Sequence, residues 1–265
     1  MELLILIRPV LMNKLPFFHI HRKSNLEDVP SPLILMVHGY GSNEQDLFSF
    51  SRAIPEEFTI ISIRGDIEIQ YNGYAWYNIS IDYNGNKSYD TNKAIESRNN
   101  IFKTIEICKN KYNIDSNNIT LLGFSQGSML VNAVALTFPD KIRNVVSLSG
   151  AFDPNIINLS SSDSLKKLSF YVSHGLNDEI LPFNLSKESL NILKENNIDY
   201  TFEEYPIGHG VSPENFKSML KWLIKKTIWS QWLNRHKTKK HFLVNFWKLH
   251  YENQVSGLYE LNMFF

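Results

Sequence analysis

The sequence contains a single cysteine, Cys108, in 265 residues, so no intramolecular disulfide can form. The absence of disulfides is compatible with a reducing compartment, and we expect a cytoplasmic protein. Cys108 lies in a helical pattern beside Ile105 and Ile107. This position favours a small core residue over a nucleophile.

Long apolar runs are absent as well. No stretch reaches the roughly 18 residues that a membrane helix requires, so we predict no integral membrane segment. Met1 to Ile7 resemble the apolar part of an export signal, but no basic residue precedes them and Arg8-Pro9 ends the run. We interpret residues 1–11 as an edge strand or an over-long start, and we predict a strand from Leu15 to Ile20.

The sequence has no excess of charge of either sign, because 27 basic side chains balance 27 acidic ones. Nucleic-acid binding needs clustered positive surface, so we predict no nucleic acid partner. Residues 227–265 differ from the rest of the chain: they combine aromatic side chains with the basic run at 235–240 and keep no helical or strand period. An added helix, a disordered tail and a reading-frame artefact are the three explanations for this extension.

The rest of the chain alternates short β-branched runs with helical patterns, which is typical of βαβ units and a mostly parallel sheet. Several runs are apolar at nearly every position, as expected where helices cover both faces of the sheet. The predicted strands are Leu33 to Val37, Phe58 to Ile63, Ile119 to Leu122, Val145 to Leu148, Ser169 to Ser173 and Tyr200 to Tyr205. The predicted helices are Glu44 to Ser51, Asn92 to Tyr112, Gln126 to Phe138, Phe183 to Asn196 and Pro213 to Lys226.

One long segment, Asp66 to Asp90, interrupts this alternation. It is rich in tyrosine, asparagine and glycine, and it includes the aromatic side chains Tyr71, Tyr74, Trp76 and Tyr77. A long loop inside a compact domain is usually functional or mobile. We therefore interpret this segment as the wall of a pocket rather than as a plain surface loop.

The segment Gly123-Phe124-Ser125-Gln126-Gly127 matches the pattern Gly-x-Ser-x-Gly. The bare pattern is weak evidence, but here a predicted strand precedes it and a predicted helix follows it. A serine on such a sharp turn is exposed at the carboxyl edge of the sheet, and the glycines let the chain turn without a clash. We predict that Ser125 is a nucleophile; the alternative is a glycine-rich turn with an incidental serine.

A serine hydroxyl needs a general base at neutral pH, and the base needs an acid that orients it. In α/β-hydrolases the chain order is serine, acid, histidine, with the last two on loops after late strands. Asp178 follows the predicted strand that ends at Ser173, and His209 follows the next strand, between two glycines. This order selects Asp178 as the acid and His209 as the base.

Other candidates fit the order less well. Glu179 is adjacent to Asp178 and stays an alternative acid, and Asp153, after an earlier strand, is a third. Six other histidines end strands in His-Gly pairs, precede the serine, or lie in the C-terminal extension: His38, His174, His19, His21, His236 and His241.

The tetrahedral intermediate of acyl transfer also needs backbone donors for its oxyanion. The amide directly after the nucleophile, that of Gln126, is the first expected donor. The second should come from the loop after an early strand, and Val37-His38-Gly39-Tyr40-Gly41 has that position. We predict the Tyr40 amide as the second donor, although His-Gly pairs also occur in purely structural turns.

Four motifs, in this order along the chain, resemble the phospholipase/carboxylesterase family, which includes acyl-protein thioesterases and small bacterial carboxylesterases. They are His38-Gly39-Tyr40-Gly41-Ser42, the Ser125 motif, His174-Gly175 followed by Asp178, and Gly208-His209-Gly210. The resemblance covers about Leu33 to Lys226. It implies a catalytic triad of Ser125, Asp178 and His209, with the Tyr40 and Gln126 amides as oxyanion donors. The segment Asn72-Gly73-Tyr74-Ala75-Trp76-Tyr77 resembles a substrate loop of the bacterial branch, which suggests Tyr74 and Trp76 as substrate-binding residues.

The chain departs from the family pattern at three places. Gly127-Ser128 stands where the family commonly has two glycines. The acid loop, Leu176 to Pro182, is close to the family pattern Asp-Pro-Val-Val-Pro but not identical to it. Residues 227–265 match no part of the family. We therefore predict a single compact α/β-hydrolase domain over residues 15–226, with helices on both faces of its sheet, and an extension over residues 227–265.

The resulting hypothesis is a serine hydrolase that cleaves a short- to medium-chain carboxylic ester or thioester through an acyl-enzyme on Ser125, with no metal or organic cofactor. Carboxylesterase is the first assignment, and lysophospholipase or acyl-protein thioesterase is the second. A serine peptidase of the same fold is less favoured, because such chains usually carry a further domain. A catalytically silent binding module is disfavoured by the intact serine, acid, histidine order.

Overall fold

The computed structural model describes residues 14–84, 86–160 and 163–229. The chain divides into two compact units, Met1–Asn215 and Phe216–Phe265. The edge strand or over-long start predicted for residues 1–11 lies outside the described residues, as do the basic run at 235–240, His236 and His241. The predicted domain bounds, 15–226 and 227–265, stay a prediction.

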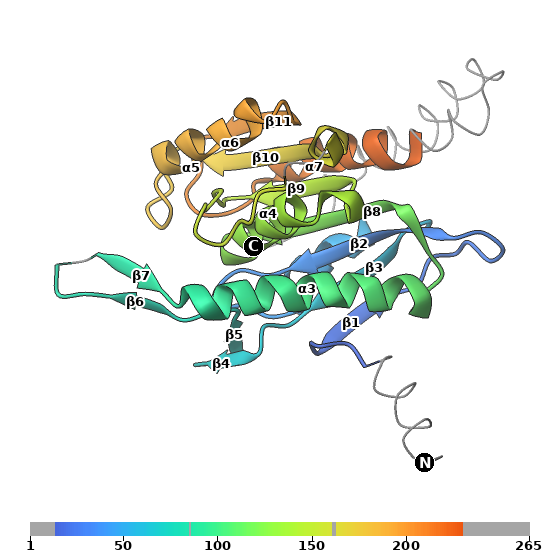
Figure 1. Cartoon of the computed structure of the whole chain (residues 1–265), viewed down its shortest axis with the longest axis horizontal. Coiled ribbons are helices and arrows are strands. Elements are labelled where there is room, and N and C mark those ends of the chain that lie inside the picture. The colour runs from blue at the N-terminus through green and yellow to red at the C-terminus, as the bar shows by residue number, and fades with distance from the viewer. Residues whose placement is uncertain (1–13, 85, 161–162, 230–265) are drawn as a thin grey trace, which may run out of the picture. The chain divides into compact units, whose positions relative to one another are not determined.

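Seven strands of the first unit form one sheet in the order β1-β3-β2-β8-β9-β10-β11 (Figure 1). Strand β1 is antiparallel to β3, and every other neighbouring pair is parallel. The predicted mostly parallel sheet is thus confirmed. The strands are β1 His19–Arg22, β2 Ser31–Val37, β3 Thr59–Ile63, β8 Ile114–Phe124, β9 Asn144–Leu148, β10 Ser169–Gly175 and β11 Asp199–Tyr205.

Parallel pairing brings the carboxyl ends of the central strands to one edge of the sheet. Val37 of β2 lies opposite Gly123 of β8, and Phe124 lies opposite Leu148 of β9. The register continues through β10 to β11, where Gly175 lies opposite Tyr205. The loops that follow β2, β8, β10 and β11 therefore start side by side, although more than 160 residues separate the first from the last.

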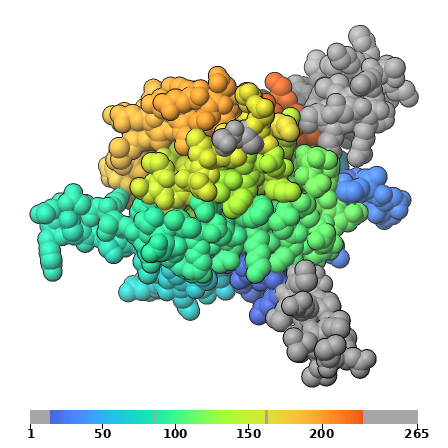
Figure 2. Space-filling view, viewed as in Figure 1, coloured from blue at the N-terminus to red at the C-terminus, as the bar shows by residue number. Residues whose placement is uncertain are grey.

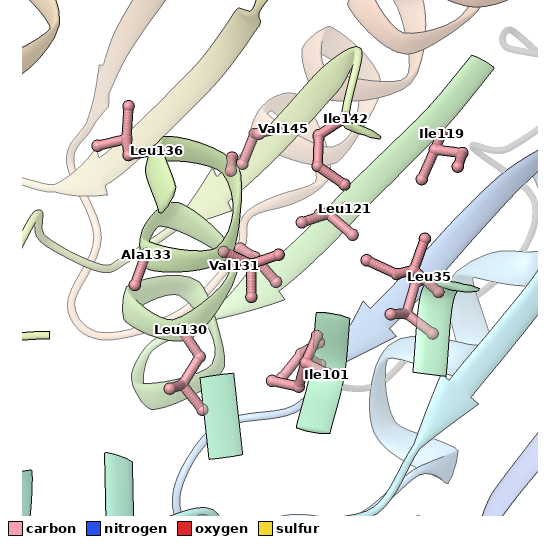
Figure 3. Packing of buried hydrophobic residues seen from close by; sticks show 14 of the residues in the cluster. Leu35, Ile101, Ile119, Leu121, Leu130, Val131, Ala133, Leu136, Ile142 and Val145 are labelled. Carbon is pink, nitrogen blue, oxygen red and sulfur yellow. The ribbon is translucent and has the colours of Figure 1, made fainter. Parts of the chain in front are cut away.

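Two long helices, α3 Thr91–Lys111 and α4 Gln126–Thr137, pack against each other and against the central strands (Figure 1). Asp90 begins α3 by accepting a hydrogen bond from the amide of Lys93, which satisfies one of the free donors of the first turn. Figure 3 shows the core between these layers: Ile101 of α3 and Val131 of α4 point toward Leu121 and Leu35 of the sheet. Burial of these apolar side chains holds the helices on the sheet.

The remaining described helices, apart from α7 (Pro213–Ile224), are short. Helix α2 Gln45–Phe48 continues into a 3-10 turn at Ser49–Arg52, and α5 Phe183–Ser189 is followed by α6 Asn191–Glu195. Further 3-10 turns cover Pro139–Lys141 and Asp163–Lys167. The predicted helix from Phe183 to Asn196 is therefore two helices, separated at Leu190, where the amide bonds to Lys187 three residues earlier.

Helix α7, Pro213–Ile224, begins in the first unit and continues into the second. A π-helical turn, Lys225–Trp229, follows it directly. The Thr227 hydroxyl donates a 2.7 Å hydrogen bond to the carbonyl of Leu223, one turn earlier. No helix among the described residues has the length and apolar character needed to cross a membrane.

The segment from Asp66 to Asp90 contains two short antiparallel hairpins, which the polar sequence did not indicate. The first pairs β4 Ile67–Ile69 with β5 Gly73–Ala75, and the second pairs β6 Ile79–Ile81 with β7 Lys87–Tyr89. The second hairpin stands away from the body of the first unit at one end of the view in Figure 2. Each of these strands is only three residues long, which is too short for a strand period of apolar residues to be recognised in the sequence.

The predicted strand from Leu15 to Ile20 is shorter and begins later, at His19. Pro16 has no amide hydrogen to contribute to a strand ladder, which explains why pairing does not extend through it. Leu15 and Phe17 are nevertheless buried in the core. Their apolar alternation therefore reflects burial without strand pairing.

We predict that replacing Leu121 by alanine lowers the free energy of unfolding by about 2 to 5 kcal/mol, because Leu121 is fully buried on the central strand β8 and its removal leaves a cavity. Urea denaturation followed by circular dichroism measures this change. Ile81→Ala on the second hairpin is the matched control: its side chain is 64% exposed, and the change should stay within about 0.5 kcal/mol. Equal effects of the two substitutions would contradict this description of the core.

Candidate active site

Ser125 occupies a strained turn between β8 and α4. Its backbone has φ 52° and ψ −117°, a conformation that L-residues rarely adopt. The glycines on either side permit close packing at this turn. A Cβ atom on Gly127 would overlap the carbonyl oxygens of Val37 and His38, and one on Gly123 would lie 2.6 Å from the carbonyl oxygen of Gly127. The strand, turn and helix expected around Ser125 are therefore present.

The three residues predicted as a triad lie in one hydrogen-bonded chain. His209 Nε2 lies 2.8 Å from Ser125 Oγ, and His209 Nδ1 lies 2.7 Å from Asp178 Oδ2. An ionised carboxylate can only accept, so we assign the proton to Nδ1, which leaves Nε2 free to accept the Ser125 hydroxyl hydrogen. The Asp178 side chain is fully buried, and the His209 side chain is 16% exposed.

Asp178 is held in place by its own loop. Its Oδ1 atom accepts hydrogen bonds from the amides of Ile180 at 2.9 Å and Leu181 at 2.8 Å. The alternative acids have other surroundings: Glu179 is exposed, and Asp153 accepts a 2.5 Å hydrogen bond from the Tyr89 hydroxyl. Of the three candidate acids, Asp178 is the one whose carboxylate contacts His209.

The loops that carry Asp178 and His209 are joined by backbone hydrogen bonds. The Leu176 amide donates to the Tyr205 carbonyl at 2.8 Å, and the Asn177 amide donates to the Ile207 carbonyl at 3.0 Å. The Ser149 hydroxyl donates to the Gly210 carbonyl at 3.2 Å, which ties the histidine loop to the end of β9. These bonds fix the separation of the two loops and allow the imidazole to span from Asp178 to Ser125.

His38 is fully buried and forms two hydrogen bonds. Its Nδ1–H donates to the Gly39 carbonyl at 2.7 Å, and its Nε2 accepts from the Gly65 amide at 3.0 Å. Burial lowers the pKa of His38, because the charged imidazolium is poorly solvated there. His38 is therefore a neutral ring that fixes the loop after β2, in agreement with its sequence assignment to loop geometry.

His174 contacts the same carboxylate as His209, a relation that the sequence did not reveal. Its Nε2–H donates to the Leu181 carbonyl at 2.8 Å and lies 3.2 Å from Asp178 Oδ2. Burial also lowers the pKa of His174. Among the residues that the structure describes, its Nδ1 has no hydrogen-bond partner.

Two backbone amides beside Ser125 have no hydrogen-bond acceptor among the described residues: those of Tyr40 and Gln126. The backbone of Gly39 lies next to the nucleophile turn, since a Cβ atom there would be 2.9 Å from the Phe124 ring and 3.4 Å from Ser125 Cβ. The Tyr40 amide follows directly. If a group attached to Ser125 developed a negatively charged oxygen, that oxygen could accept hydrogen bonds from these two amides.

The predicted substrate-binding residues Tyr74 and Trp76 have different surroundings. Tyr74 is half-buried, and its ring lies under the Arg64 guanidinium, which is held by Glu44 through a 2.7 Å hydrogen bond. Trp76 is 0% exposed, and its ring packs edge-on against Phe17. Substrate contact by either residue stays a prediction, and the difference in burial favours Tyr74.

The segment around Tyr74 is attached to the loop after β2. The Gly41 amide donates to the Tyr74 carbonyl at 2.9 Å, and the Tyr74 amide donates to the Ser42 carbonyl at 2.7 Å. The predicted pocket-wall segment and the predicted oxyanion loop therefore form one backbone structure. Within the described parts of the chain, no cluster of three histidine, cysteine, aspartate or glutamate side chains is arranged to hold a metal ion.

The model of the phospholipase/carboxylesterase family matches residues 20–228. A probable carboxylesterase, SOBER1-like, from Arabidopsis thaliana is 32% identical over 113 residues, which are 42% of this chain and 43% of the relative. The matched region thus spans less than half of that protein. Acyl-protein thioesterase 1 from Emericella nidulans is 26% identical over 211 residues, covering 72% of this chain and 88% of the relative.

Solved structures share the fold. The crystal structure of the Bacillus cereus carboxylesterase superposes with a TM-score of 0.70 at 19% identity, covering 82% of this chain and 98% of that one. The structure of SOBER1 from Arabidopsis thaliana gives a TM-score of 0.63 at 20% identity, covering 74% and 99%. At such identities the likeness establishes the fold alone, and the predicted α/β-hydrolase fold is confirmed.

We predict that the free energy of unfolding falls as the pH decreases from 7 to 5, partly because of His38 and His174. In the folded protein the pKa values of these two histidines lie below the ordinary value of 6.5, so the unfolded chain binds more protons in this pH range. A decrease in pH therefore favours the unfolded state. In His38→Gln the amide oxygen can still accept from Gly65 but does not titrate. Urea denaturation at several pH values should give a smaller slope for this variant; an unchanged slope would contradict the prediction.

Proposed function

The chain belongs to the phospholipase/carboxylesterase family, and from that membership we propose that it hydrolyses carboxylic esters or thioesters through an acyl-enzyme on Ser125. The observation that supports this most strongly is the hydrogen-bonded chain from Ser125 through His209 to the buried Asp178. A nucleophile, a general base and an orienting acid are the three groups that such a reaction requires.

In the first step, Ser125 Oγ attacks the carbonyl carbon of the substrate while His209 Nε2 takes the hydroxyl proton. The carbonyl π electrons move to the oxygen, which becomes an oxyanion. The amides of Tyr40 and Gln126 donate hydrogen bonds to it, and their lack of acceptors within the described residues supports this role. Asp178 stabilises the imidazolium and holds its ring in orientation.

The tetrahedral intermediate then collapses. The bond to the leaving oxygen or sulfur breaks, and the leaving group takes the proton from His209 Nε2, which releases an alcohol or a thiol. A water molecule next gives a proton to His209 and attacks the acyl carbonyl. Ser125 leaves as its oxygen recovers the proton, and the carboxylic acid is released.

The substrate class that we propose is a short- to medium-chain carboxylic ester. A thioester is the second candidate, since one relative that covers most of the chain is named acyl-protein thioesterase 1. Lysophospholipase activity is a further variant of the same chemistry. Tyr74 is the proposed substrate contact, because part of its side chain stays accessible beside the loop that carries Tyr40.

A cytoplasmic location is also a proposal. It rests on the single cysteine, which precludes an intramolecular disulfide and which is buried in the core.

Burial raises the pKa of the Cys108 thiol to about 12, so this cysteine is not the nucleophile at neutral pH. Ser125 is therefore the proposed nucleophile.

We predict that a fluorophosphonate probe labels the full-length protein and that Ser125→Ala abolishes the labelling, because the probe reacts with an activated serine. In-gel fluorescence and intact mass spectrometry measure the adduct. Ser80→Ala, on the exposed hairpin strand β6, is the control and should label like the unmodified protein. Equal labelling of Ser125→Ala would refute the assignment of the nucleophile.

We predict that Asp178→Asn lowers kcat for an activated ester by about 10⁴-fold, because the amide favours the wrong tautomer of His209. Initial rates of p-nitrophenyl ester hydrolysis measure the loss, and circular dichroism verifies that the variant is folded. Glu179→Gln is the matched control on the adjacent exposed residue and should retain activity within about twofold. A large loss in Glu179→Gln with normal activity in Asp178→Asn would transfer the role of the acid.

A further inference from the structure

Trp76 contacts both segments that carry the proposed oxyanion donors. Its indole Nε1–H donates a 2.8 Å hydrogen bond to the carbonyl of His38, two residues before Tyr40. Its backbone amide donates a 3.0 Å hydrogen bond to Oε1 of the Gln126 side chain. All of these groups are buried. One residue far from Ser125 in the sequence thereby links the end of β2 to the first turn of α4.

The side chain of Gln126 completes this link. While Oε1 accepts from the Trp76 amide, Nε2 donates a 2.8 Å hydrogen bond to the Tyr77 carbonyl. The side-chain amide therefore pairs with the backbone of two consecutive residues, using one donor and one acceptor. A buried pair of this kind is costly to break, because each unpaired polar group loses its hydration without compensation.

Trp76 is itself held from other directions. The Ser97 hydroxyl of α3 donates a 2.7 Å hydrogen bond to the Trp76 carbonyl, and the Phe17 ring packs against the indole with centroids 5.1 Å apart. Gly65 allows the peptide between Ala75 and Trp76 to approach the backbone after β3, since a Cβ atom on Gly65 would overlap the carbonyl of Ala75. Trp76 is thus anchored to α3 and to the segment after β3, independently of the two donor segments.

The His38 carbonyl, to which the indole binds, lies where β2 meets α4. A Cβ atom on Gly127 would overlap this carbonyl oxygen, so the helix turn and the end of β2 are in direct contact. The orientation of the His38 peptide sets the direction in which the chain leaves β2. It therefore sets the direction of the Tyr40 amide relative to the Gln126 amide.

We propose that Trp76 and the Gln126 side chain are positioning residues that fix the separation and direction of the Tyr40 and Gln126 amides. The inference rests on the proposed function, since it concerns the oxyanion of that reaction. Donors that are fixed in advance stabilise charge that develops in the transition state. Their displacement should lower kcat while leaving KM nearly unchanged.

The test uses two full-length variants, Trp76→Phe and Gln126→Met. The first removes the indole N–H but keeps an aromatic ring; the second removes the side-chain amide but keeps its length. Neither changes a backbone amide. Each should lower kcat for p-nitrophenyl acetate by about 10- to 100-fold with KM within about threefold, since small misplacements of catalytic groups have effects of this size.

The second substrate is the matching thionoester, in which sulfur replaces the carbonyl oxygen. The ratio of the kcat values for the ester and the thionoester is a readout that loss of packing alone would not change. Sulfur accepts hydrogen bonds weakly, so turnover of the thionoester depends less on the two amides. The ratio of ester to thionoester kcat should fall at least about fivefold in both variants. In Leu121→Ala, which removes a buried side chain that takes no part in these hydrogen bonds, the ratio should equal that of the unmodified protein.

The outcomes separate the two proposals. If the unmodified protein does not hydrolyse the ester, or if Ser125→Ala hydrolyses it equally well, the proposed function is wrong. If hydrolysis depends on Ser125 but Trp76→Phe and Gln126→Met retain the ester-to-thionoester ratio, the positioning role is wrong while the function stands. If one variant does not fold, the ratio in the other decides.

Discussion

The first turn of α4 lies in direct contact with the carbonyl groups of Val37, the last residue of β2, and of His38, at a separation that a residue with a Cβ atom at position 127 would not allow. This approach places the strained turn at Ser125 beside the loop that carries Tyr40. It also brings the His38 carbonyl to the point where the Trp76 indole binds it. The proposed nucleophile and both proposed oxyanion donors therefore depend on one close backbone contact between a strand and a helix.

A second set of backbone contacts serves the acid and the base. Strands β10 and β11 pair in parallel, and hydrogen bonds continue beyond their ends, from Leu176 to Tyr205 and from Asn177 to Ile207. The carboxylate of Asp178 accepts from two amides of its own loop as well as from His209. The geometry of the candidate triad thus follows from the sheet and its loops, and the side chains need little freedom to reach one another.

The candidate site could be located from the sequence where short motifs encode the backbone. The glycines beside Ser125 and His209, and the order of serine, aspartate and histidine, lead to the three residues that the structure brings together. Sequence reasoning missed the contact between His174 and Asp178, because the His-Gly pair indicated only loop geometry. It also missed the two hairpins after Asp66, because their strands of three residues are too short to show a period. Trp76, which was suggested as a substrate-binding residue, has a fully buried side chain, and its contact with a substrate stays a prediction.

By itself, the sequence determined the family, the alternation of strands and helices, and the residues proposed for acyl transfer, because local turn chemistry and hydrophobic periodicity are encoded in consecutive residues. The tertiary structure decided which carboxylate contacts His209, which histidines are neutral supports and which groups surround the proposed oxyanion site. These properties depend on burial and on hydrogen bonds between segments that are distant in the chain. The link from Trp76 to His38 and Gln126 is of this kind: it joins residues 38 and 50 positions apart, and no local pattern encodes it.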